Sequence, residues 1–82
     1  MNPEYAKRLR DLGMQIARCR RKKGMTQMEL AKKAGISRTH MSNIEAAGME
    51  KGISLELLFC ISDILEVSVE ELLKPTDFCH RF

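Results

Sequence analysis

The sequence predicts a compact all-α domain built from five helices. Helix-favouring residues (Leu, Ile, Met, Ala, Glu and Lys) are abundant, and only two prolines and five glycines interrupt the 82-residue chain. One helix-start pattern also recurs four times: an apolar residue, a Ser or Thr cap, and another apolar residue four positions after the cap. The alternation typical of strands is absent beyond Val67 to Val69. A chain of this length has room for one domain.

The first helix is expected to begin at Pro3 and to run to about Lys23. Asn2 is a suitable N-cap, and proline is favoured at the first helical position. Gly24 can adopt the left-handed conformation that ends many helices. Five apolar residues at alternating spacings of four and three share one face: Tyr5, Leu9, Leu12, Ile16 and Cys19.

Four further helices are expected to begin after the caps Thr26, Ser37, Ser54 and Ser68. The apolar pairs that flank these caps are Met25 and Leu30, Ile36 and Met41, Ile53 and Leu58, and Val67 and Leu72. Glu29 and Glu71 stand where a reciprocal capping box needs them. The fourth helix should end near Leu65 and the fifth at Lys74, because Pro75 cannot continue a helix. The domain therefore spans residues 1–74, and residues 75–82 form a tail.

Charge is distributed unevenly along the chain. Residues 1–38 carry a net charge of +8 and residues 39–82 carry −5, which together give +3. A positive face suits a polyanionic partner, because each neutralised phosphate releases condensed counterions. A solvated basic face is the alternative interpretation.

The segment from Gln27 to Ala46 has the form of two helices joined by a tight turn. The connection consists only of Ala34, Gly35 and Ile36, and so short a turn makes the helices meet at a steep angle. The small Ala31 permits close contact between them, and Gly35 can take a positive φ. The expected buried seam is Leu30, Ala34, Ile36, Met41 and Ile44.

Residues 16–73 resemble the lambda-repressor-like (XRE) helix-turn-helix family. The resemblance rests on IARCRRKKGMTQMELAKKAGISRTHMSNIE and SLELLFCISDILEVSVEELL, which include the TQxELA run at Thr26 and the SRxxxSxIE run at Ser37. It implies a five-helix, lambda-repressor-like DNA-binding domain that binds duplex DNA in a sequence-specific manner, usually as a dimer. We therefore expect a transcriptional regulator, in particular a repressor that binds an inverted-repeat operator as a homodimer.

The resemblance also implies roles for individual residues. The base-contacting residues would be Arg38, Thr39 and Asn43, whose side chains suit guanine, thymine and adenine edges respectively. Gln27 matches a residue that binds a phosphate at the start of the second helix. Weaker candidates for secondary or backbone contacts are His40, Ser42, Lys22, Lys23 and Lys51.

Two structural features are also expected. Arg20 and Glu45 match a pair that joins the first helix to the end of the third in members of the family. Leu55 and Phe59 are left outside the apolar stripe of the fourth helix, so they form a candidate dimer patch with Phe78 and Phe82 of the tail. Coverage of Leu55 and Phe59 by the first and fifth helices is the alternative.

Other functions are less well supported by the sequence. A protein-interaction module of the same fold, such as an antitoxin or a coactivator-like adaptor, is the main alternative. A thiol or metal sensor would use Cys60, Cys79 and His80, whose spacing defines no site. No catalytic constellation, cofactor motif, membrane span or signal peptide is recognisable, so we expect a cytoplasmic, non-enzymatic protein with reduced cysteines.

Overall fold

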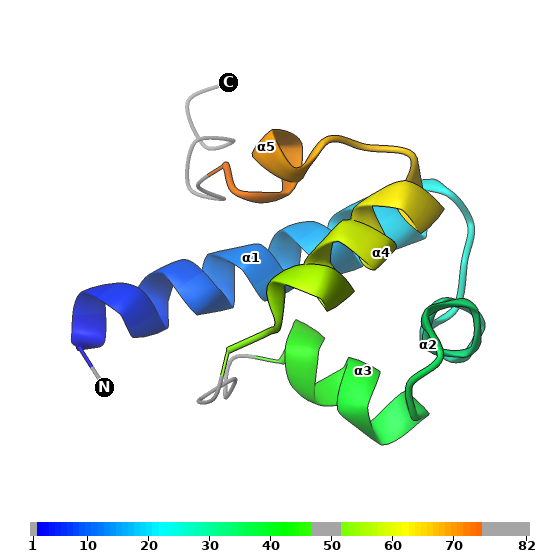
Figure 1. Ribbon diagram of the computed structural model, residues 1–82, viewed down its shortest axis with the longest axis horizontal. Helices are drawn as coiled ribbons and strands as arrows, with labels where there is room; N and C mark the ends of the chain where they lie inside the picture. Colours follow the sequence, from blue (N-terminus) through cyan, green and yellow to red (C-terminus); the bar gives the residue numbers. More distant parts are fainter. Residues whose placement is uncertain (1, 47–51, 75–82) are drawn as a thin grey trace.

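The computed structural model describes residues 2–46 and 52–74, and these residues form five helices and no strand (Figure 1). The helices are α1 (Pro3–Lys22), α2 (Gln27–Ala34), α3 (Arg38–Glu45), α4 (Leu55–Leu65) and α5 (Val69–Leu72). The predicted all-α fold class is confirmed. In the described part of the chain, no helix is both long and apolar enough to cross a membrane.

Each helix begins directly after the residue that the sequence predicts as its cap. The side-chain oxygens of Asn2, Thr26, Ser37, Ser54 and Ser68 each accept a hydrogen bond from a backbone amide of the first turn. At Thr26 the capping box is complete, because the Glu29 carboxylate also accepts from the Thr26 amide at 2.8 Å.

The predictions for α5 are partly wrong. The Glu71 carboxylate pairs with the Lys74 ammonium at 3.2 Å instead of closing a capping box on Ser68. A charged donor attracts a carboxylate more strongly than a neutral amide does. The helix also ends at Leu72, two residues before Lys74. The residue that precedes a proline is disfavoured in the helical region, so the turn before Pro75 unwinds early.

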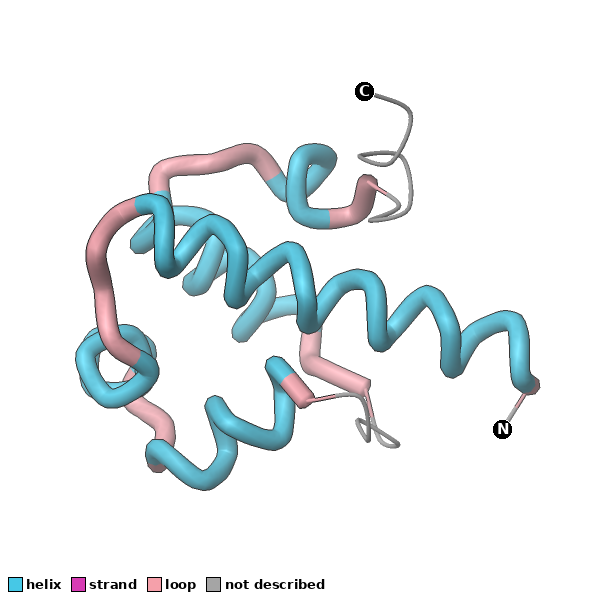
Figure 2. Tube along the Cα trace, turned by 180° about the vertical axis from the view of Figure 1, so that it is seen from behind, coloured by secondary structure: helices cyan, strands magenta, loops and turns pink. Residues whose placement is uncertain are grey.

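The helices are arranged around α1 and α4, which lie side by side in the middle of the molecule (Figures 1 and 2). The helix α5 lies on one side of this pair and α3 lies on the other, in both views. The helix α2 contacts α3 and α4 near the C-terminal end of α1. The arrangement leaves the outer side of α3 away from the rest of the domain.

The core lies where all five helices meet. Its buried members are Leu12, Ile16, Leu30, Ala31, Met41, Ile44, Leu58, Ile61, Leu65 and Leu72. Leu9 and Cys19 of the predicted α1 face are half-buried against this core, as expected. Tyr5 is 55% exposed, so the face does not extend to the first turn. The start of α1 projects beyond the other described helices (Figure 1).

Candidate nucleic-acid interface

The turn between α2 and α3 has the geometry that its residues predict. Gly35 has a φ of 74°, a left-handed conformation that a side chain would strain. Ala31 is 2% exposed, so the small side chain lies in the contact between α2 and its neighbours. Ala34 and Ile36 are half-buried and complete the seam with Leu30, Met41 and Ile44. The turn therefore holds α3 at a fixed angle to α2.

The helix α3 has one buried side and one exposed side. Met41 and Ile44 are buried in the core, and Thr39 and Asn43, one turn apart, lie on the opposite side and are exposed. Arg38 and His40 are also exposed, whereas Ser42 is half-buried. The candidate base-contacting residues Arg38, Thr39 and Asn43 therefore share the free surface of α3, with His40 beside them.

A buried polar network fixes the C-terminal end of α3. The Arg20 Nε and Nη2 atoms donate to the two Glu45 carboxylate oxygens at 2.8 and 3.1 Å, and Nη1 donates to the Met25 carbonyl at 2.7 Å. The two charged side chains are only 10% and 5% exposed. The expected structural pair of Arg20 and Glu45 is thus present as a two-pronged ion pair, which restricts the orientation of both side chains.

Gln27 belongs to the same network, a role that the sequence analysis does not predict. Its Nε2 atom donates to Glu45 Oε1 at 3.0 Å. Because an amide nitrogen carries two hydrogens, one donor remains for a second partner. Through Glu45, the start of α2, the end of α3 and the last turns of α1 are joined in a single hydrogen-bonded unit.

A positively charged hollow lies beside this network. Residues from the end of α1, the start of α2 and the start of α3 line it. Arg21 and Arg38 contribute its positive charge, whereas the charge of Arg20, which also lines it, is compensated by Glu45. Helix N-termini present amides without partners inside the helix, and α2 begins in this hollow at Gln27. The hollow combines the features that bind a phosphate group. Arg21 is absent from the predicted site, although its place in the basic run Arg20–Lys23 is a signal for it.

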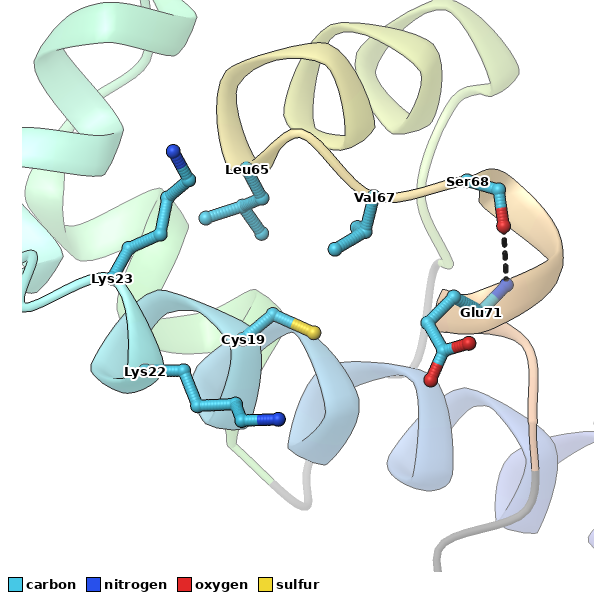
Figure 3. Close-up of a pocket in the computed structure, with 7 residues that line it drawn as sticks. All are labelled: Cys19, Lys22, Lys23, Leu65, Val67, Ser68 and Glu71. Carbon is cyan, nitrogen blue, oxygen red and sulfur yellow. Dashed lines mark hydrogen bonds between the residues drawn. The ribbon is translucent and has the colours of Figure 1, made fainter.

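Lys22 and Lys23 lie in a different pocket, which α3 does not line (Figure 3). Their neighbours there are Cys19 and residues from the end of α4 to Glu71. Lys23 is paired with Glu66, and this hydrogen bond holds the pKa of the Glu66 carboxyl below its ordinary value. The structure therefore does not bring these two lysines together with the exposed side of α3.

The thiol of Cys19 is half-buried in this second pocket, and burial raises its pKa, with the nearby Glu71 carboxylate acting in the same direction. A raised pKa disfavours the reactive thiolate. Cys79 and His80 of the considered sensor site lie outside the described residues. Within residues 2–46 and 52–74, no group of three potential metal ligands is close enough to hold an ion.

The candidate dimer patch is only partly described. Leu55 and Phe59 are 63% and 50% exposed and stand one turn apart on α4. The alternative, that α1 and α5 cover them, is wrong. Lys51, Phe78 and Phe82 lie outside the described residues.

Comparison with known proteins identifies the family. A family model described as helix-turn-helix matches residues 16–72. The chain belongs to the helix-turn-helix family. This assignment agrees with the lambda-repressor-like resemblance over residues 16–73.

Individual relatives agree with the family assignment. The transcriptional regulator SinR of Bacillus licheniformis is 36% identical over 66 residues, which cover 80% of this chain and 59% of SinR. The chain thus matches about three fifths of that relative's length. A crystal structure of SinR in complex with DNA superposes with a TM-score of 0.69 at 36% identity, covering 77% of this chain and 98% of that chain.

A restriction-modification controller protein, C.Esp1396I, is also similar in structure. It was solved as a tetramer in complex with its natural 35 base-pair operator. It superposes with a TM-score of 0.64 at 34% identity, covering 80% of this chain and 95% of that chain.

Proposed function

We propose that this helix-turn-helix domain is a transcriptional regulator that binds duplex DNA in a sequence-specific manner, with α3 in the major groove. The observation that carries the proposal is the free side of α3, where Arg38, Thr39 and Asn43 are exposed on a helix whose other side is fixed in the core. Arginine can donate two hydrogen bonds to guanine, asparagine can pair with adenine, and the threonine methyl can contact thymine.

The hollow beside Arg20, Arg21 and Arg38 supplies the matching phosphate contact. The second hydrogen of Gln27 Nε2 would donate to a phosphate oxygen while the first remains bonded to Glu45. A single phosphate would then contact the same network that orients α3. Gln27 thus combines the predicted phosphate contact with a structural role.

We further propose that the protein acts as a repressor and binds an inverted-repeat operator as a homodimer. The oligomeric complex of the related controller protein with its operator supports this assembly. The apolar patch of Leu55 and Phe59 offers a surface for the second subunit. Half-sites should then be spaced about one helical turn, roughly 34 Å, apart along the DNA.

Selection of binding sites from a random pool of duplexes tests the proposal, because it reports sequence preference, symmetry and half-site spacing together. Arg38→Ala and Asn43→Ala should each relax the preference at one base pair, a loss of about 1–3 kcal/mol of discrimination. Gln27→Ala should weaken binding to all sequences alike. Arg8→Ala, on the exposed surface of α1, is the matched control and should retain wild-type selection.

The interaction-module alternative makes a different prediction in the same assay. Binding without sequence preference, equally weak across a series of salt concentrations, would favour an adaptor that contacts protein. Variants of Arg38 and Asn43 that bind selected and random duplexes in the wild-type ratio would show that α3 is not the recognition helix.

A further inference from the structure

Gly13 occupies the middle of α1, a place where glycine weakens a helix. The residue is buried, and its Cα lies directly against the last turn of α3. A Cβ atom at this position would lie 2.3 Å from the Ile44 carbonyl oxygen and 3.3 and 3.4 Å from the carbonyl carbons of Ile44 and Glu45. All three are backbone atoms, so no side-chain rotation could make room for a methyl group.

The helix α1 contacts the end of α3 at Gly13. A second contact is the ion pair between Arg20 and Glu45, two helical turns further along the same side of α1. Gly13 limits the distance between the two backbones, and the ion pair fixes the orientation of the terminal turn. Together they determine how far α3 stands out from the domain.

We propose that Gly13 is a positioning residue for recognition, which sets the depth at which α3 presents Thr39 and Asn43 to DNA. This inference rests on the proposed function. For a Cβ to reach ordinary contact at 3.4 Å, the Ile44 carbonyl would have to retreat by about 1 Å. Recognition side chains need to be held within roughly 0.5 Å of their productive geometry. The displacement is therefore large enough to disturb hydrogen bonds to base edges without abolishing phosphate contacts.

The test is the variant Gly13→Ala, which has a better helix former at this position but lacks space for its methyl group. Its affinity should be measured for duplexes selected by the wild-type chain and for random duplexes of the same length. The ratio of the two affinities should fall by on the order of tenfold. Helix content, measured by circular dichroism, should be unchanged.

A matched control separates positioning from general destabilisation. Ile61→Val alters the core at α4 and should lower stability while keeping the wild-type affinity ratio. If Gly13→Ala is partly unfolded, all three proteins are compared in trimethylamine N-oxide, which favours the folded state. Failure to fold under these conditions would show that Gly13 serves folding alone and would overturn the inference.

Two further outcomes distinguish the positioning role of Gly13 from the proposed sequence-specific DNA binding on which it rests. A folded Gly13→Ala variant with the wild-type ratio would overturn the positioning role and leave the proposed function intact. A wild-type chain that selects no sequence would overturn both.

Discussion

At the scale of single residues, the arrangement of α3 depends on a few polar side chains with little access to water. Arg20 and Glu45 satisfy each other's charges, and Met25 and Gln27 occupy further hydrogen-bonding positions. Removal of one member of a buried pair leaves the other charge without compensation, which is far more harmful than the loss of an exposed pair. The network therefore couples the stability of the domain to the position of α3, the proposed recognition helix.

Arg20→Ala should accordingly lower the free energy of unfolding by about 3–5 kcal/mol, because the Glu45 carboxylate would remain buried with Gln27 as its partner. The exposed pair between Arg8 and Glu4 gives a matched control, and Arg8→Ala should lower the same quantity by less than about 1 kcal/mol. Urea denaturation followed by circular dichroism measures both. Equal, small effects of the two substitutions would mean that water reaches the Arg20 site.

At the scale of elements, the sequence was most informative about where helices begin. Caps act between residues only two or three positions apart, so Thr26, Ser37 and Ser54 could be assigned from local patterns alone. The exposure of Tyr5 could not be predicted from local patterns, because it depends on which parts of α1 the other helices cover. The length of α5 was overestimated for a different, local reason, because Pro75 disfavours the helical conformation of the residue before it.

The site was predictable to a lesser degree. The exposed side of α3 follows from helical periodicity, and the pair of Arg20 and Glu45 follows from family resemblance. The hydrogen bond from Gln27 to Glu45 and the contact of Gly13 with Ile44 depend on how the helices pack, which local sequence patterns do not indicate. A glycine inside a strong helical pattern is nevertheless a signal of close backbone approach, and Gly13 shows it.

The capping box of α2 gives a prediction about pH. Hydrogen bonding to the Thr26 backbone amide lowers the pKa of Glu29 below its ordinary value of 4.5. The ionised carboxylate therefore stabilises the folded state fully above about pH 4.5, and this contribution disappears as the pH falls through the lowered pKa of the native state. The unfolding free energy of wild type should exceed that of Glu29→Gln at about pH 7, and the difference should shrink at about pH 3.

Urea titrations of both proteins at the two pH values measure this difference. Because glutamine retains an oxygen acceptor for the Thr26 amide, the comparison isolates the charge of Glu29 from its shape. A difference that stays constant between neutral and acidic pH would show that the charge contributes nothing to the cap.

At the scale of the whole molecule, the basic and acidic residues are separated onto different helices. The basic residues 1–38 form α1, α2 and the start of α3, whereas most acids of the described C-terminal part lie on α4 and α5. Because α5 and α3 lie on opposite sides of the central helix pair, the acidic helix α5 lies away from α3, the proposed recognition helix (Figure 1). An approaching duplex would be attracted to the recognition side and repelled by the other, so binding should weaken steeply with salt.

The proposed homodimer depends on the exposed patch of Leu55 and Phe59 on α4. Changing both residues to glutamate would place like charges in the interface and should weaken self-association by on the order of tenfold or more. The fold of the monomer should be preserved, because both side chains are at least half exposed.

Tyr5→Glu, at a similarly exposed aromatic position on the projecting end of α1, is the control and should leave association unchanged. Sedimentation equilibrium measures the three proteins, and operator titrations should show weakened binding only for the double variant. A wild-type chain that remains monomeric on and off DNA would refute the homodimer, and wild-type association of the double variant would move the interface elsewhere.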